Sequence, residues 1–270
     1  MISASIIADS LSPGGVRLTT FVLVYPRFIH SEFLTHRVFS RNAASSRAIP
    51  VKKMLAYIRS NPALPVSWGK NQSGMQANEE LDPFTQERAK EKWLEACSDA
   101  VRHSEDLMNL GVHKQVANRI TEPFVHMNTI CTATEWENFF NLRRHKAAQP
   151  EIKVLADEMW KAYQESKPRS LFGEEWHLPF ILKEEWNNPI DLLKKCSVAR
   201  CCRVSYMNHD GTKPDAVKDV ILHDTLIASG HMSPLEHIAT PAPAAVVWYG
   251  NFRGWKSYRK FISNEDVFRG

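Results

Sequence analysis

The sequence predicts an α+β fold that is rich in helix and contains a small antiparallel or mixed sheet. Apolar residues recur at helical spacing over several long stretches. By contrast, β-branched and aromatic residues concentrate in two short stretches, residues 17–29 and 238–249. Because the helical patterns cover more of the chain than the strand patterns, we expect helices to dominate.

The N-terminal stretch VRLTTFVLVYPRF (17–29) predicts a strand that enters a short helix. Residues 60–83 hold several prolines and glycines and predict a long polar excursion. A helix should follow, because Asp82 can cap it, Pro83 fits its first turn and Gly111 fits the position just after its end.

Residues 130–166 are expected to be mostly helical, with a break or bend at Pro150. Residues 168–190 are irregular and are interpreted as a link between two halves of one domain. We therefore expect a single domain over residues 1–270, with residues 60–110 as an insertion.

The C-terminal part predicts one helix and one strand. Residues 215–229 carry an amphipathic pattern that Gly230 should end. Residues 238–249 resemble a strand, which Pro241 and Pro243 would shorten or confine to a sheet edge.

Composition excludes several classes of protein. The 270 residues include 34 basic and 30 acidic side chains, a net charge of +4, with 43% hydrophobic and 24% charged residues, so a disordered chain is excluded. No apolar run approaches the roughly 20 residues that span a bilayer, and the N-terminus does not resemble a secretory signal. Five cysteines without a regular framework favour a reducing, cytoplasmic location. The small positive charge favours a phosphorylated ligand but is too weak to indicate nucleic acid.

Several familiar catalytic motifs are absent. The chain has no GxGxxG, no GxxxxGK[ST], no HExxH, no GxSxG and no CxxC pair. His231 and His237, with Glu236 between them, match no standard metal-ligand spacing. We expect neither a serine hydrolase nor a metal site.

Three clusters remain as candidate sites. The first, THRVFSRNAASSR (35–47), interleaves arginines with serines and an asparagine, which suits a phosphate or another oxyanion, although a solvated basic loop would look the same. The second, NFFNLRRHKAAQPEI (138–152), could equally be an ordinary helix end. The third combines RVSY (203–206) with GHMSPLEH (230–237).

Together, these clusters resemble the flavin-dependent thymidylate synthase family. The first is similar to the signature R-H-R-x-x-S-x-N-E-x-S-x-R of that family, the second to its NFxxLR…AQxEI helix, and the third to its ARVS and GHxxPxEH segments. In the familiar order the third cluster precedes the signature, whereas here it follows it, which suggests a circular permutation. The signature positions matched are His36, Arg37, Ser40, Asn42, Ser45 and Arg47.

The resemblance implies a function and a set of site residues. It implies reductive methylation of dUMP to dTMP, with FAD as cofactor, NADPH and methylenetetrahydrofolate as co-substrates, and active sites shared between the subunits of a homotetramer. Ser45, Arg47 and Arg119 would bind the dUMP phosphate, and Arg143 would act as the catalytic residue beside the pyrimidine ring. No cysteine nucleophile is implied. The implied FAD contacts are His36, Arg37, Asn42, Asn138, Ser205, His231, Ser233 and Glu236.

Three departures from the family pattern leave the substrate open. Ala43 replaces the signature glutamate, Thr35 replaces the leading arginine, and Glu32 stands where glutamine is frequent. Glu32 could bind the nucleotide in place of the lost carboxylate, or it could accept from an exocyclic amine and favour another pyrimidine, with methylation or hydroxymethylation of dCMP as the alternative reaction. A third interpretation, a nucleic-acid-binding module, would need exposed stacking aromatics such as Trp255 and Tyr258 beside Arg259 and Lys260.

Overall fold

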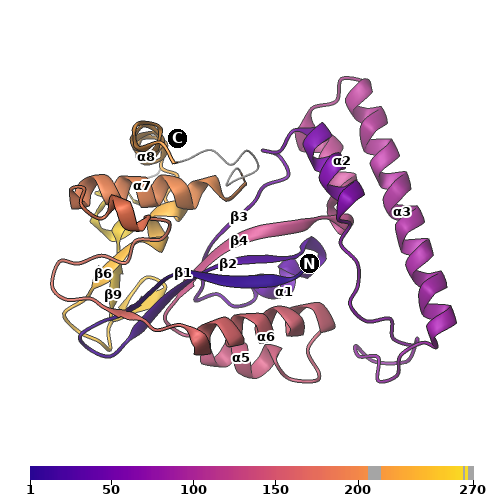
Figure 1. Cartoon of the computed structure of the whole chain (residues 1–270), viewed down its shortest axis with the longest axis horizontal. Helices are drawn as coiled ribbons and strands as arrows, with labels where there is room; N and C mark the ends of the chain where they lie inside the picture. The colour runs from indigo at the N-terminus through magenta and orange to yellow at the C-terminus, as the bar shows by residue number, and fades with distance from the viewer. Residues whose placement is uncertain (206–213, 264, 267–270) are drawn as a thin grey trace.

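A mixed five-stranded sheet forms the centre of the computed structural model, which describes residues 1–205, 214–263 and 265–266 (Figure 1). The strand order is β3-β4-β2-β1-β5, and each pair is antiparallel except the parallel pair of β1 with β5. The prediction of an α+β fold with a small mixed sheet is confirmed. The strands are β1 (Ser3–Leu11), β2 (Arg17–Pro26), β3 (Ser40–Ala43), β4 (His126–Ala133) and β5 (Arg169–Ser170).

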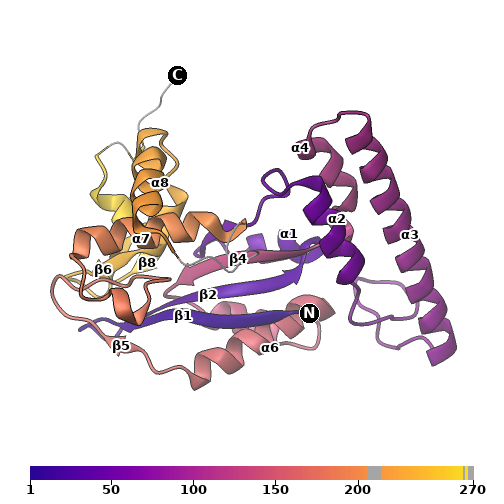
Figure 2. The same ribbon diagram turned by 45° about the horizontal axis from the view of Figure 1, so that its top comes forward.

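One face of the sheet is covered by α5 (Glu137–Arg143) and α6 (Pro150–Glu165) (Figures 1 and 2). Side chains alternate along β2, so Phe21, Leu23 and Tyr25 all enter the buried cluster on this face. This alternation explains why β2 and the short helical segment that follows it were predictable. That segment comprises η1 (Arg27–Ile29) and α1 (His30–Leu34).

The opposite face is covered by α7 (Ile190–Cys202), α8 (Ala216–Ala228) and the 3₁₀ segment η5 (Ser233–His237) (Figure 2). Val22 of β2 and Ile130 of β4 pack into this second cluster. The short turn η4 (Arg203–Ser205) follows α7 directly.

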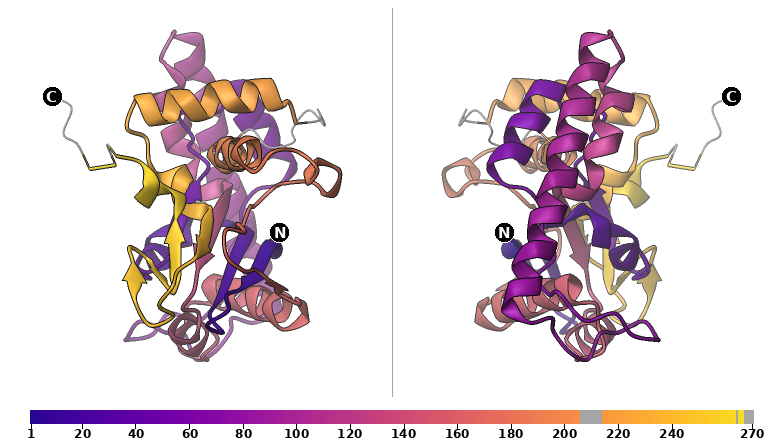
Figure 3. Two further views of the ribbon diagram at one scale, coloured as in Figure 1. Left: turned by 90° about the vertical axis from the view of Figure 1, so that its left-hand side faces the viewer. Right: turned by 90° about the vertical axis from the view of Figure 1, so that its right-hand side faces the viewer.

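A third group of helices lies beyond one end of the sheet, away from α7 and α8 (Figure 1). The helix α3 forms the outer side of this group (Figure 3, right). It consists of α2 (Val51–Ser60), α3 (Pro83–Asn109), α4 (Lys114–Ala117) and η2 (Asn118–Phe124), which share a buried cluster. The predicted helix is confirmed as α3: the Asp82 carboxylate accepts from the Thr85 N–H at 3.1 Å, and Gly111 adopts a φ of +83° just after the helix. Within the described residues, no helix is long and apolar enough to cross a membrane.

Two predicted elements are wrong in part. The mostly helical interpretation of residues 130–166 fails at its start, because residues up to Ala133 belong to β4. The break expected at Pro150 is present, since α5 ends at Arg143 and Pro150 begins α6. The single strand over residues 238–249 is replaced by two separate pairs, since Pro241 and Pro243 cannot donate to a ladder. Strand β6 (Ala239–Pro241) pairs with β9 (Trp255–Ser257), and β7 (Trp248–Tyr249) pairs with β8 (Phe252–Arg253).

The helix expected over residues 215–229 is α8, and only part of its apolar pattern faces the interior: Leu226 is buried and Ile227 packs against the second cluster. Val217 and Ile221 are 71% and 62% exposed, whereas Asp219 and His223 are buried. Periodicity failed here because ion pairing, rather than apolar contact, holds Asp219 in the interior. Residues 168–190 are largely irregular, as expected, apart from β5 and η3 (Lys183–Glu185).

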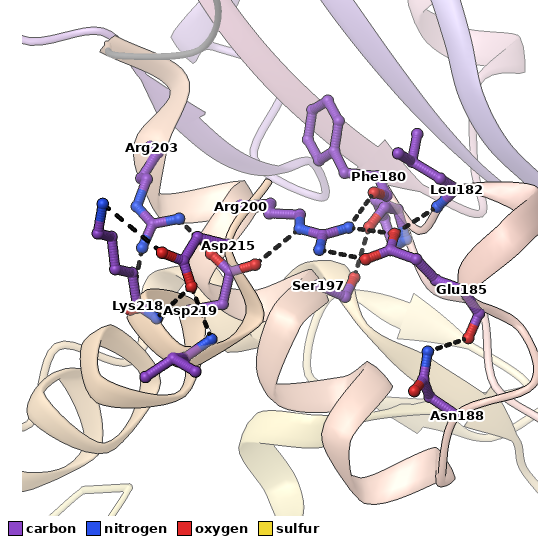
Figure 4. Close-up of polar contacts among 12 residues, drawn as sticks. Phe180, Leu182, Glu185, Asn188, Ser197, Arg200, Arg203, Asp215, Lys218 and Asp219 are labelled. Carbon is purple, nitrogen blue, oxygen red and sulfur yellow. Dashed lines mark hydrogen bonds and ion pairs between the residues drawn. The ribbon is translucent and has the colours of Figure 1, made fainter. Parts of the chain in front are cut away.

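A buried ion-pair network joins α7 to α8 and to the segment before α7 (Figure 4). Arg200 donates from Nε to Asp219 at 2.9 Å and, through both Nη atoms, to the Glu185 carboxylate at 2.6 Å. Arg203, in the turn η4, also contacts Asp219. The fully buried Asp219 carboxylate therefore receives two guanidinium groups, and this fixes η4 against α8.

We predict that Asp219→Ala lowers the free energy of unfolding by about 3–5 kcal/mol, because it leaves two guanidinium groups without their shared partner. Asp191→Ala, at the start of α7, is the matched control: its carboxylate is 81% exposed and pairs with Lys194, so it should cost no more than about 1 kcal/mol. Urea unfolding of both variants measures the difference. Equal losses would contradict the importance assigned to the buried network.

Candidate active site

Arg143 is the last residue of α5, and its guanidinium contacts the segment that leads into β3. Its Nε donates to Nε2 of His36 at 2.9 Å. Its Nη2 donates to Oγ1 of Thr35 at 3.0 Å and to the carbonyl oxygen of Glu32 at 3.4 Å. The described residues give Nη1 no hydrogen-bond partner. These contacts hold the guanidinium in one orientation and leave Nη1 available as a donor.

His36 is neutral in this arrangement. Its side chain is buried between the rings of Phe39 and Phe139. Burial first, and then the positive charges of Arg143 and Arg41, lower its pKa to about 4. Because a guanidinium only donates, Nε2 must accept from Arg143, and the ring proton is therefore assigned to Nδ1.

The arginines of the first cluster have different environments. Nη1 of Arg41 donates to the carbonyl groups of Phe33, Leu34 and His36 at 3.1–3.3 Å, so Arg41 stabilises the end of α1 and does not form an open anion site. Arg37 and Arg47 are exposed. Residues 40–43 of this cluster form β3, so the cluster is only partly a loop.

The segment after β3 lies beside η2, and the two share the carboxylate of Glu122. Its Oε1 accepts from the Ser46 hydroxyl and from Nη1 of Arg119, both at 2.8 Å, and lies 3.2 Å from Nη2 of Arg27. Arg119 therefore lies next to the Ser45–Arg47 segment, although more than 70 positions separate them in the sequence.

Backbone contacts fix the shape of this segment. The side-chain amide of Asn118 donates to the carbonyl oxygens of Ser46 and Ile49 at 2.7 and 2.9 Å. The Arg47 N–H donates to the Ser45 Oγ at 3.3 Å. A buried asparagine thus anchors the turn from which Arg47 extends into solvent.

The remaining residues of the first two clusters lie at different depths. Asn42 is half-buried in β3, and its Oδ1 is buried without a hydrogen-bond partner. Glu32 is half-buried, and its carboxylate accepts from the Ser31 hydroxyl at 2.9 Å. Asn138 is exposed on α5.

The third cluster forms the turns η4 and η5, and both turns pack against β3 and β4. His231 is exposed, Ser233 is half-buried, and Glu236 accepts from Nη1 of Arg259 at 2.7 Å. Ser205 ends η4, and its side chain lies outside the described part of the chain. His237, at the end of η5, is fully buried.

The predicted site residues therefore form two groups within one chain. Arg143, His36 and Glu32 lie on the side of the sheet that α5 covers, while Ser233 and Glu236 lie with η5 on the other side. The edge strand β3 connects the groups, since His36 lies in the segment that leads into it and η5 packs against it. Sequence reasoning missed Glu122 and His237. Glu122 follows Arg119 at i+3, and His237 ends a recognised motif, so both could have been found.

Three other features lie apart from these groups. A crevice of about 300 Å³ lies between α2 and α3, lined by residues that include Ile58, Arg59 and Cys97. Trp255, proposed above as a possible stacking residue, is fully buried and donates to the Val16 carbonyl at 3.1 Å. Cys201 is also fully buried, and burial raises its thiol pKa well above the usual range, as expected for a packing residue.

Comparison with known families identifies the class of this protein. Residues 11–169 match the family described as "Thymidylate synthase complementing protein" (Thy1), and this match covers more than half of the chain. The chain therefore belongs to this flavin-dependent thymidylate synthase family and is an enzyme of the methyltransferase type. The RVSY and GHMSPLEH segments lie outside the matched residues.

Two solved structures share the fold. Both are of the UMP/dUMP methylase PolB from Streptomyces cacaoi, one bound with 5-Br dUMP and the other with 5-Br UMP. The TM-scores are 0.52 and 0.53 at 15% and 16% identity, with 61% of this chain and 90% or 89% of the other chain covered. The search of curated proteins gave no match.

We predict that His36 makes the protein lose stability as the pH falls from about 6.5 towards 4. The folded-state pKa of about 4 lies below the ordinary 6.5, so the unfolded chain binds the proton first and gains up to roughly 3 kcal/mol over this window. His36→Gln keeps an acceptor for Arg143 but does not titrate, so its stability should decline less.

Urea unfolding at pH 7, 5.5 and 4.5 measures the effect, with His145→Gln as the control because His145 is exposed. If His36→Gln and the wild type lost stability in parallel, His36 would not be the buried neutral group described here.

Proposed function

We propose that this enzyme methylates dUMP to dTMP, with FAD as cofactor and with NADPH and methylenetetrahydrofolate as co-substrates. One observation carries the nucleotide part of the proposal. Arg27, Arg119 and Arg47 gather around the turn that contains Ser45 and Ser46, and Glu122 is the only acid bonded to them among the described residues. Three positive charges and one negative charge leave a net +2, which complements a nucleoside monophosphate.

The phosphate would bind to Arg47, Arg119 and the Ser45 hydroxyl. Arg47 already projects into solvent, and Arg119 is half-exposed, so both can turn towards an anion. Glu122 holds Arg119 in place before binding, and the negative charge of a phosphate would compete with it for the guanidinium. Fixed donors of this kind lower the entropic cost of orienting the substrate.

Arg143 would face the pyrimidine ring. His36, Thr35 and Glu32 fix its Nε and Nη2, so Nη1 can donate to a ring carbonyl where negative charge develops as C5 becomes nucleophilic. His36 supports this role because its neutral ring accepts from Arg143 without adding a competing positive charge.

The environment of β3 fits a flavin. In the part of the chain that the structure describes, Asn42 Oδ1 and His237 Nε2 are buried without hydrogen-bond partners. Because η5 packs against β3, polar atoms able to bind a heterocycle lie near each other in the fold. The residues proposed to hold FAD are His36, Arg37, Asn42, Asn138, Ser205, His231, Ser233 and Glu236. Bound reduced flavin supplies the hydride, and the chain supplies binding and orientation.

The division of these residues between two sides of the sheet favours an assembly in which a second copy completes each site. We propose a homotetramer in which η5 of one subunit and Arg143 of another contribute to one active site. The packing of η4 and η5 on β3 supports a rearranged order of the family segments, since residues distant in sequence occupy neighbouring positions.

A second candidate is the modification of dCMP. Its basis is Glu32, whose carbonyl accepts from Arg143 and whose half-buried carboxylate could accept from an exocyclic amine. Ala43 removes the acid expected in the signature, so Glu32 would be the acid nearest to the base. Purified enzyme supplied with FAD, NADPH, methylenetetrahydrofolate and either dUMP or dCMP tests the two candidates. The mass of the product distinguishes a methyl group from a hydroxymethyl group, and an unchanged nucleotide in both reactions would exclude both proposals.

We predict that Arg143→Lys lowers kcat by about 10²–10³ while the Kd for FAD stays within about twofold, because lysine keeps the charge but loses the fixed donor. The control is Arg144→Lys, since Arg144 is exposed and pairs with Asp157 away from this contact. Steady-state kinetics and flavin titration measure both quantities. Retention of full kcat by Arg143→Lys would remove Arg143 from the catalytic role.

We predict that Arg47→Ala and Arg119→Ala each raise the KM for dUMP about 10- to 100-fold, because each removes a charge-assisted hydrogen bond to the phosphate. Deoxyuridine, which lacks the phosphate, is the matched substrate: the variants and the wild type should use it equally poorly. An equal KM increase for both substrates would show that these arginines do not bind the phosphate.

A further inference from the structure

A continuous chain of hydrogen bonds crosses the sheet beneath η5. The Ser10 hydroxyl bonds to Nδ1 of His177 at 2.8 Å, and Nε2 of His177 bonds to the Thr20 hydroxyl at 2.7 Å. The Thr20 and Thr132 hydroxyls are 2.7 Å apart, and Thr132 bonds to Nδ1 of His237 at 2.8 Å. All five side chains are buried. The hydrogen-bond chain ends at His237 Nε2, a buried atom that has no partner within the described residues.

The strand register produces this chain. Thr20 of β2 and Thr132 of β4 are directly opposite each other, so their side chains lie on the same face of the sheet. His177 reaches this chain of hydrogen bonds because its backbone pairs with Ala239 of β6, the strand beside β9. His237 reaches it from η5. Three separate parts of the sequence therefore meet at a pair of threonine hydroxyls.

Both imidazoles are neutral. Burial lowers the pKa of His177 and of His237 to about 3, and the His177 ring lowers that of His237 further. A neutral imidazole has one N–H donor and one acceptor nitrogen, and a hydroxyl donates only once. Among the described residues, the two threonine hydroxyls have no other partners. A threonine that accepted from both neighbours would leave its own buried hydrogen without an acceptor. When each threonine both donates and accepts, every link in the chain is oriented in the same direction.

Only two arrangements of the protons satisfy all four links and also use the hydrogen of both threonine hydroxyls. If Ser10 donates to His177, each following group donates in turn, and both rings carry their proton on Nε2. If the direction is reversed, both rings carry their proton on Nδ1, and Ser10 keeps an unused donor. The chain therefore couples the tautomer of His237 to that of His177 on the far side of the Thr20–Thr132 pair.

We propose that Ser10, His177, Thr20 and Thr132 are positioning residues that set the tautomer of His237, so that its Nε2–H donates to a carbonyl oxygen of a bound heterocycle. The choice of flavin or pyrimidine as that heterocycle rests on the proposed function, but the coupling between the two histidines does not. In the selected arrangement every donor in the chain is used once the ligand accepts from Nε2.

The first part of the test reads the tautomers directly. Long-range ¹H–¹⁵N spectra of histidine-labelled protein report which ring nitrogen carries the proton, and His177→Gln and His237→Gln assign the signals. We expect His177 and His237 to show the same tautomer populations in the free protein, and both to become Nε2–H when FAD and dUMP are added. Opposite tautomers in the wild type would overturn the coupling.

The second part breaks the chain at one link. Thr132→Val should uncouple the two tautomers and weaken FAD or dUMP binding about 3- to 10-fold, whereas Thr132→Ser, which keeps the hydroxyl, should restore both. Thr129→Val is the matched control, because Thr129 is equally buried in β4 but bonds to Tyr25 on the other face. Unchanged tautomers in Thr132→Val would overturn the proposal.

The outcomes separate this proposal from the proposed function. If neither FAD nor dUMP binds the wild type, the proposed function fails, while the tautomers of the free protein still decide whether the histidines are coupled. If both ligands bind without changing the His237 Nε2 signal, the coupling can stand, but the donation from Nε2 to the ligand is refuted.

Discussion

The antiparallel pairing of β2 with β4 is the constraint on which the rest of the structure depends. Its register presents Phe21, Leu23 and Tyr25 to the helices on one face, and Thr20 and Val22 to the opposite face. A shift by one residue would exchange the two faces and separate Thr20 from Thr132. Each group of candidate site residues packs on one of these faces, so a single register positions both.

The sequence predicted elements whose local signals agree with their tertiary environment. The helix α3 has a capping aspartate, a proline in its first turn and a glycine after its end, and its boundaries followed from them. In β4, the sequence HMNTICTA mixes polar and apolar residues on both faces, because each face carries a buried threonine hydroxyl, Thr132 on one and Thr129 on the other. In α8, a buried carboxylate replaces an apolar side chain. In both cases polar groups satisfied by distant partners hide the pattern that periodicity detects.

The candidate site was foreseeable as a set of residues but not as an arrangement. Motifs identified Arg143, His36 and the Ser45–Arg47 segment, yet only the fold shows that Thr35 and Glu32 orient Arg143, or that Glu122 lies among the arginines. These contacts join positions about 75 to 111 apart in the chain. Spacing along the sequence carries no information about such contacts, whereas a helix cap can be read from neighbouring residues.

The order of the segments has a consequence for synthesis on the ribosome. Strands β1 to β4 are complete once Ala133 has emerged, but η5, which covers their hydroxyl-bearing face, ends at His237. At a synthesis rate of about 5–20 residues per second, that face stays uncovered by η5 for roughly 5 to 20 seconds. The hydroxyl groups of Ser10, Thr20 and Thr132 can form hydrogen bonds to water during this interval. The nascent sheet therefore exposes less aggregation-prone apolar surface than it would if this face were entirely apolar.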